Sequence, residues 1–237
     1  MDTKIRICRF IDRADEIWRK AVTLILIIAS VYVVTTIYDI YSFNQAGMGG
    51  LEYHSFSELM GINPDISAWI RIEGTNIDHP VVQGKDNYEY LSKDINGNDY
   101  AGGSIFLDCG NRKDFSDSFI IIHGHHMSGG AMFGDLACFR EEKFFSGHTE
   151  GELLTPHDEY ILTIAGSATV DAYDGSVYMA DRSSLPLELL EKCDLRRDLT
   201  FGKNDKLIAL STCSGDMSNN RTVVFARARS SESEDEQ

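Results

Sequence analysis

Short runs of β-branched and aromatic residues, separated by Gly, Asn and Asp, recur along most of the chain. They occupy residues 69–72, 81–82, 104–107, 119–122, 160–164, 207–210 and 223–225. Evenly punctuated short strands of this kind are typical of closed barrels and sandwiches. The pattern therefore predicts a mainly β domain.

Short helical segments interrupt the predicted strands. Residues 51–60 place apolar side chains on one side of an imperfect amphipathic helix, and the turn signal Asn63-Pro64-Asp65 follows it. Further helical pieces are expected at 88–93, 132–139 and 185–193. The last lies in a long insertion before the 207–210 strand, where Pro186 suits a first helical turn.

Residues 21–38 carry no charge, are rich in Ile, Leu and Val, and are long enough to span hydrocarbon. Positively charged residues precede them, and no Lys or Arg follows until Arg71. The positive-inside rule then places residues 1–20 in the cytoplasm and everything after about residue 41 outside. A cleaved signal peptide is disfavoured because no small-residue cleavage pattern follows. A buried core helix is disfavoured by the flanking charges. We expect an uncleaved, single-pass signal anchor over 21–41.

The remaining boundaries follow from composition. Residues 42–50 read SFNQAGMGG, which predicts a flexible linker, and residues 51–229 form the predicted folded domain. Residues 230–237 contain only Ser, Glu and Asp before a final Gln, which predicts a disordered acidic tail. A net charge of −15 argues against nucleic acid as a partner.

The five cysteines are odd in number and show no C-x-x-C spacing, which favours neither a zinc site nor a dense disulfide framework. A Cys109–Cys138 or Cys138–Cys193 bridge is compatible with an extracellular location. Free, buried thiols are the expectation for these residues.

One cysteine stands in a different context. The apolar run 207–210 ends on Ser211-Thr212-Cys213, a polar loop follows, and a β-branched run resumes directly after Arg221. This pattern predicts two strands joined by a loop, with Cys213 ending one strand and Arg221 starting the next. A thiolate is a nucleophile, and a nearby guanidinium favours its ionisation and stabilises an oxyanion. The alternative is a Cys that only packs at a strand end.

A second stretch supplies the base that a nucleophilic cysteine needs. An apolar strand at 119–122 leads into His123, His125 and His126 within a glycine-rich turn. Such a base usually lies far from the cysteine in sequence. Metal binding is the alternative, but no fourth ligand, Cys pair or HExxH helix accompanies the histidines. We therefore predict no metal site.

These motifs resemble the active-site strands of sortases, the cysteine transpeptidases of Gram-positive cell surfaces. The resemblance is carried by Ala209-Leu210-Ser211-Thr212-Cys213, by the R-x-V-V strand from Arg221 and by Gly124-His125. Further matches to the class B branch occur in the family's order over roughly residues 51–229. They include Asn63-Pro64-Asp65, Pro80-Val81-Val82-Gln83-Gly84, Gly103-Ser104-Ile105-Phe106-Leu107-Asp108 and Met132-Phe133-Gly134-Asp135-Leu136.

The resemblance implies a closed eight-stranded β-barrel with N-terminal helices and a helix-containing insertion before the cysteine strand. It implies that Cys213 is the nucleophile, His125 the acid–base partner and Arg221 the group that binds the substrate carbonyl or oxyanion. Ser211 and Thr212, adjacent to the nucleophile, are the expected substrate-binding residues. His123 and His126 are expected either to support the site from outside the reacting residues or to be incidental.

The function implied is that of a membrane-anchored, extracellular cysteine transpeptidase without metal or organic cofactor. It would cleave an NPxTN-like or (S/N)PxTG-like sorting signal of a surface protein after Thr and join that protein to a peptidoglycan amine. A cysteine hydrolase that uses water as the acceptor is one alternative. A non-catalytic surface module, in which these residues are structural, is the other.

Overall fold

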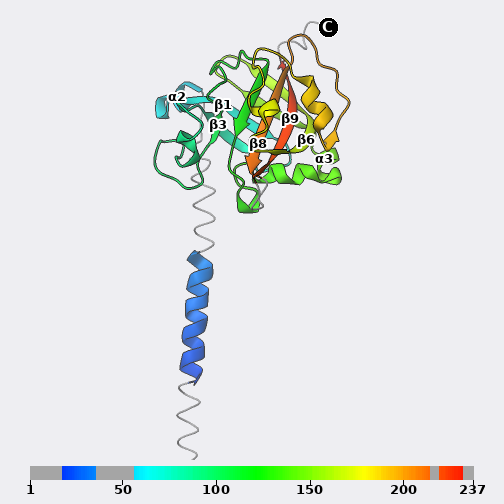
Figure 1. The fold of residues 1–237 in the computed structure, drawn as a ribbon. Helices are drawn as coiled ribbons and strands as arrows, with labels where there is room; N and C mark the ends of the chain where they lie inside the picture. The colour runs from blue at the N-terminus through cyan, green and yellow to red at the C-terminus, as the bar shows by residue number, and fades with distance from the viewer. Residues whose placement is uncertain (1–17, 36–55, 214–218, 232–237) are drawn as a thin grey trace, which may run out of the picture. The chain divides into compact units, whose positions relative to one another are not determined.

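The computed structural model describes residues 18–35, 56–213 and 219–231 of the 237-residue chain (Figure 1). The predicted linker 42–50 lies outside these residues, as do most of the cytoplasmic segment and of the acidic tail. The chain divides into an N-terminal unit and a larger C-terminal unit, which are described separately.

The N-terminal unit contains one described helix, Trp18–Thr35, which is long and apolar enough to cross a membrane. Its large apolar side chains are exposed along its whole length, among them Leu26 and Val34. An apolar helix without protein cover is the kind that a lipid bilayer solvates. The helix overlaps the predicted anchor 21–41, of which 36–41 lie outside the described residues.

The C-terminal unit is built on nine described strands in the order β5-β1-β2-β3-β4-β8-β9-β6-β7. A β5–β6 pairing joins the first strand to the eighth, so eight strands close into a barrel, and β7 pairs only with β6. The predicted closed eight-stranded barrel is therefore confirmed. The strands are β1 (Ile66–Ile72), β2 (Asp78–Val82), β3 (Ile105–Leu107), β4 (Phe119–His123), β5 (Glu150–Leu154), β6 (Glu159–Asp171), β7 (Leu195–Arg196), β8 (Lys206–Cys213) and β9 (Asn220–Ser230).

Strand β8 explains why some strands lack the alternation of apolar and polar residues. Ile208 and Leu210 belong to the core cluster to which all eight barrel strands contribute. Leu207 and Ala209 point to the other face, where they join a second cluster with Leu189 of the insertion. A strand covered on both faces reads as a continuous apolar run. The insertion therefore covers the outside of the barrel beside the end of the cysteine strand.

The helices are shorter and tighter than the sequence predicted. Helix α2 covers Phe56–Ile62, while the first half of the predicted 51–60 helix lies outside the described residues. The predicted helices at 88–93, 132–139 and 185–193 are the 3₁₀ segments η1 (Glu89–Leu91), η3 (Gly134–Arg140) and η4 (Leu187–Lys192). The remaining helical elements are η2 (Ser128–Gly130), α3 (Glu142–Gly147) and α4 (Gly175–Tyr178).

Strands β5 and β7 were not predicted, and β6 extends well beyond the predicted 160–164. Strand β5 reads EGELL, and Glu and Gly are poor strand formers, so the pairing with β1 and β6 must supply its stability. The second half of β6 includes the small residues Gly166, Ser167 and Ala168, which pair with β9 after an irregularity at Ala165. Tertiary pairing, rather than local preference, sets these boundaries.

Candidate active site

The ends of β8 and β9 bring Cys213 and Arg221 together. Cys213 is the last residue of β8, and its Cα is the register partner of Arg221, the second residue of β9. The sequence predicted these two strands, with Cys213 ending one and Arg221 starting the next. Residues 214–218 and the Cys213 side chain lie outside the described part of the structure, so the position of Cys213 is given by its backbone.

A pocket of about 400 Å³ lies at this end of the barrel. Four of the five predicted site residues line it, namely His125, Ser211, Thr212 and Arg221. Since Cys213 follows Thr212 directly, the described parts of the predicted site converge on one cavity. Sequence analysis missed other lining residues, among them Asn87, Leu91, Asp108 and Tyr178.

His125 lies two residues beyond the end of β4 and is half-buried. Its Nε2–H donates to the backbone carbonyl of Leu91 at 2.8 Å, because a carbonyl can only accept. In the neutral ring this bond leaves Nδ1 as the nitrogen that can accept a proton. The contact with Leu91 thus fixes both the orientation of the ring and its tautomer.

Close packing requires a glycine at position 124, directly before His125. A Cβ at Gly124 would lie 2.8 Å from ring atoms of Phe133, closer than real Cβ contacts. The Gly124 N–H donates to the Ser211 carbonyl, and the Phe133 N–H donates to the His125 carbonyl. Glycine therefore lets the turn that carries His125 pack directly onto Phe133 and onto the strand that ends at Cys213.

Ser211 and Thr212 line the pocket, but only 3% and 2% of their surface is exposed. The Ser211 hydroxyl lies 2.9 Å from the Tyr178 hydroxyl, which comes from the insertion. The Thr212 Oγ1 is buried without a hydrogen-bond partner among the described residues. The expected substrate-binding residues are thus placed in the wall of the pocket, and Tyr178 engages one of them.

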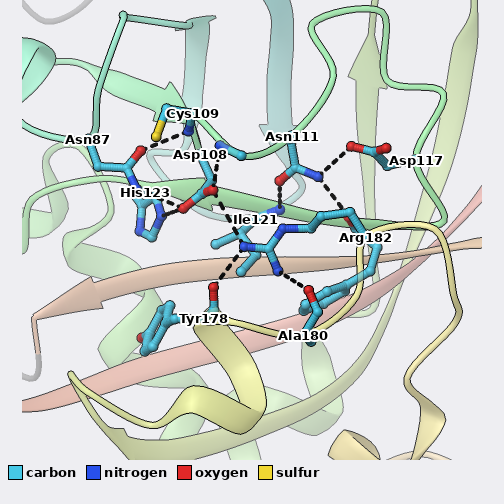
Figure 2. A network of polar contacts seen from close by, with 12 residues as sticks. Asn87, Asp108, Cys109, Asn111, Asp117, Ile121, His123, Tyr178, Ala180 and Arg182 are labelled. Carbon is cyan, nitrogen blue, oxygen red and sulfur yellow. Dashed lines mark hydrogen bonds and ion pairs between the residues drawn. The ribbon is translucent and has the colours of Figure 1, made fainter.

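Asp108, which lines the pocket, is the centre of a polar network (Figure 2). Its carboxylate accepts hydrogen bonds from Asn87 Nδ2 at 2.9 Å, His123 Nε2 at 3.1 Å and the Gly110 N–H at 2.9 Å. Arg182 Nη2 adds an ion pair at 3.4 Å. Burial raises the pKa of Asp108, but the contacts with His123, Gly110 and Arg182 outweigh it and lower the pKa to about 2. The group is therefore a carboxylate at any physiological pH.

His123 has a structural partner that sequence analysis did not find. It is the last residue of β4, its ring lies near Phe106 and Tyr178, and its Nε2–H donates to Asp108. This contact agrees with the supporting role that was one of the two expectations for His123, although its partner was not predicted. His126 forms an isolated bridge with Met132 instead. The role of His123 follows from its contact with Asp108, which is 15 residues away along the chain. No local sequence pattern links the two residues.

Among the residues whose side chains the structure describes, Cys109, Cys138 and Cys193 have free thiols. For these three the expectation of free thiols is confirmed, but that of burial is wrong for Cys109, which is exposed beyond the end of β3, and Cys138 and Cys193 are only half-buried. Cys193 is packed against Gly166, and burial raises the pKa of its thiol to about 12. None of the three lines the pocket.

Comparison with known proteins agrees with this geometry. The sortase domain family matches residues 70–229. Sortase B of Staphylococcus aureus is 30% identical over 179 residues, which cover 73% of this chain and 73% of that protein.

Solved structures agree in sequence and in fold. Sortase B of Clostridium perfringens is 34% identical with a TM-score of 0.68, covering 74% of this chain and 100% of that one. A class B sortase of Streptococcus pyogenes involved in pilus biogenesis is 33% identical with a TM-score of 0.67, covering 74% and 98%. The barrel, the order of its motifs and the residues gathered at the end of β8 thus have one explanation: this chain belongs to the sortase family of cysteine transpeptidases, on its class B branch.

Proposed function

We propose that the protein cleaves a C-terminal sorting signal of an NPxTN-like or (S/N)PxTG-like type after Thr and joins the Thr carboxyl to a cell-wall amine. One observation carries the proposal. His125, Arg221, Ser211 and Thr212 line a single pocket, at the strand end where Cys213 is the register partner of Arg221.

In the proposed first step, the thiol proton of Cys213 passes to His125, and the resulting thiolate attacks the Thr carbonyl carbon and forms a C–S bond. The negative charge that develops on the carbonyl oxygen is stabilised by the guanidinium of Arg221, a planar cation with several N–H donors. The C–N bond to the next residue then breaks, and His125 gives a proton to the leaving amine. The product is a thioacyl-enzyme.

In the proposed second step, an acceptor amine attacks the thioester carbonyl, and His125 takes a proton from that amine. The C–S bond breaks, Cys213 leaves as thiolate, and a new amide is formed. The hydrogen bond from His125 Nε2–H to Leu91 supports Nδ1 as the nitrogen that carries this proton. Such a bond keeps the ring in one orientation through both steps.

We propose that the apolar helix Trp18–Thr35 is a signal anchor, with residues 1–20 in the cytoplasm and the domain 51–229 outside. The support is the asymmetry of positive charge. Residues 1–20 contain six Lys or Arg, and none follows the apolar stretch until Arg71. The partners are then surface proteins with a sorting signal and an amine of the peptidoglycan.

The acceptor amine separates wall anchoring from polymerisation. The similar class B sortase of Streptococcus pyogenes is described as involved in pilus biogenesis. A pilus is joined through the side-chain amine of a protein, whereas wall anchoring uses an amine of peptidoglycan. We propose wall anchoring for this chain and treat a protein amine as a competing outcome.

The test uses the full chain in detergent micelles with fluorogenic peptides of the NPxTN, SPxTG and LPxTG types. Each peptide is incubated with and without a peptidoglycan stem-peptide amine or a lysine-containing protein segment, and products are read by mass spectrometry. We expect cleavage of one motif after Thr, with an adduct to the peptidoglycan amine.

Two variants provide the controls. Cys213→Ala must abolish cleavage, whereas Cys138→Ala, which removes a thiol outside the pocket, must not. Cleavage without an adduct at any amine would replace the transpeptidase proposal with a hydrolase. An adduct only to the lysine segment would replace wall anchoring with polymerisation.

A further inference from the structure

The Asp108 carboxylate contacts two segments that line the active-site pocket from different parts of the chain. One is the segment 86–91, called here the Asn87 segment. The other is the segment 175–182 of the insertion, called here the Tyr178 segment. Figure 2 shows Asn87 above the carboxylate and Tyr178 below it. Asp108 itself follows β3 directly, and its side chain is 9% exposed.

On one side, Asp108 fixes the Asn87 segment. Asn87 Nδ2 donates to the Asp108 carboxylate at 2.9 Å, and Asn87 Oδ1 accepts from the Cys109 N–H at 2.8 Å. Both polar ends of the Asn87 amide are therefore held by the chain beyond β3. The same segment ends at Leu91, whose carbonyl accepts the hydrogen bond from His125.

On the other side, Asp108 fixes the Tyr178 segment through Arg182. Arg182 Nη2 lies 3.4 Å from the carboxylate and also donates to the Tyr178 carbonyl at 2.9 Å. Arg182 Nη1 donates to the Ala180 carbonyl at 3.1 Å. The guanidinium thus holds the end of α4, and the Tyr178 hydroxyl reaches Ser211, two residues before Cys213.

The chemistry at this position calls for a carboxylate. All four groups that face its two oxygens are donors: the Asn87 amide, the His123 ring, the Gly110 N–H and the Arg182 guanidinium. An acceptor-only group satisfies all of them, whereas an amide of the same shape turns an NH₂ group toward donors. Because the site is buried, the mismatch cannot be relieved by water at no cost.

We propose that Asp108 is a positioning residue for the transpeptidase reaction, one that sets the spacing between the Asn87 segment and the Tyr178 segment. Both segments line the pocket in which the sorting peptide is proposed to bind, so this inference rests on the proposed function for its kinetic consequence. Asp108 does not touch the reacting atoms. Its loss therefore weakens peptide binding more than it slows the chemistry.

The first test compares kinetics of the full chain in detergent micelles with its Asp108→Asn variant. We expect KM for the cleaved peptide to rise about tenfold, the effect of one or two lost charged hydrogen bonds, while kcat changes less than threefold. Alkylation of Cys213 by iodoacetamide, followed on its own tryptic peptide, keeps its wild-type rate.

The matched control is Asp205→Asn. The side chain of Asp205 is 5% exposed and accepts two hydrogen bonds from Arg229, but it lies before β8, at the opposite end from Cys213. This variant loses a partly buried ion pair and lowers the melting temperature without changing KM. An unchanged KM in Asp108→Asn, or an equal rise of KM in both variants, would overturn the proposal.

The second test needs no peptide and covers the case of a wild-type chain that cleaves none. Hydrogen exchange of Asp108→Asn must accelerate in both the Asn87 and the Tyr178 segments, whereas Arg182→Gln must accelerate it in the Tyr178 segment alone. Acceleration in neither or only one segment of Asp108→Asn contradicts the proposal. If Asp108→Asn does not fold, Arg182→Gln decides: wild-type exchange in the Tyr178 segment overturns the proposal, and acceleration confined to it supports the proposal.

Discussion

Cys213 and Arg221 are cross-strand neighbours, although seven residues separate them along the chain. They are the last of eight consecutive register pairs between β8 and β9, a ladder that begins at Lys206 and Ala228. A long antiparallel ladder fixes the relative position of its end residues far better than a loop does. The proposed nucleophile and the proposed oxyanion partner are thus placed by the barrel itself.

Replacing Arg221 should therefore remove charge stabilisation without disturbing the ladder. We expect Arg221→Ala to lower kcat/KM about 100- to 1000-fold, as the loss of an oxyanion donor does in other enzymes. Arg221→Lys should recover part of the loss, because an ammonium keeps the charge but not the planar fork. Arg227→Ala, on the same strand but bonded to Thr163 and Thr200, serves as the control. Activity within threefold of wild type in Arg221→Ala would refute the assigned role.

His125 is expected to act in both steps. His125→Gln should lower kcat by about 100- to 10,000-fold, the range for loss of a general acid–base group. In this variant, Cys213 should form an adduct with a small activated thioester faster than it turns over a peptide. The reason is that only the amine that leaves from an amide needs a proton from His125. His157→Gln, whose ring lies outside the active-site pocket, should behave as wild type in both assays. Equal loss on both substrates in His125→Gln would point to a general structural role.

The decrease in the free energy of unfolding at acid pH should depend on Asp108. Its pKa is lowered from 3.8 to about 2 in the folded chain, so the unfolded chain binds the proton first as pH falls. The stabilisation, on the order of 2 kcal/mol, is present above pH 4 and is lost between about pH 4 and pH 2. Melting temperatures of wild type and Asp108→Asn should therefore differ at pH 6 and converge toward pH 2. A difference that stays constant over this range would exclude the linkage.

The turn before His125 should not tolerate a side chain. Gly124→Ala places a methyl group 2.8 Å from the ring of Phe133, and we expect a loss of about 1–3 kcal/mol in stability together with lower activity. Gly61→Ala is the matched control, because nothing lies within 4 Å of its Cβ and Gly61 is in helix α2. Urea denaturation of both variants tests this, and Gly61→Ala should be neutral or stabilising. Equal destabilisation by the two changes would contradict the packing argument.

The free thiols should differ in reactivity. Burial raises the pKa of Cys193 to about 12, so its thiol should resist iodoacetamide at pH 8 while the exposed Cys109 is modified. Mass spectrometry of separate tryptic peptides distinguishes the two sites. Modification of Cys193 at the rate of Cys109 in the folded chain would show that the insertion opens from the barrel.

The mainly β domain, and the two strands that carry Cys213 and Arg221, could be predicted because they rest on local patterns, whereas the closed barrel and the pairing of Cys213 with His125 were implied by the resemblance to sortases. The apolar run of β8 and the residues Ser211-Thr212-Cys213 that end it are contiguous in the chain. The segment EGELL of β5 has no such pattern, because neighbouring strands hold it in place. The pairing of Asp108 with Arg182 spans 74 residues and leaves no trace in either neighbourhood. Contacts of this kind are set by the fold and are found only when the fold is known.

The closure of the barrel through β5 and β6 also limits how a peptide can be held. Among the described strands, the eight of the ring have neighbours on both sides, and the one outer strand, β7, has two residues. An extended peptide therefore finds no long open edge to which it could add itself as a further strand. Side chains and loops at the open end of the barrel must therefore recognise the peptide. Exchanging these segments between relatives is the direct way to change which peptide sequence is bound.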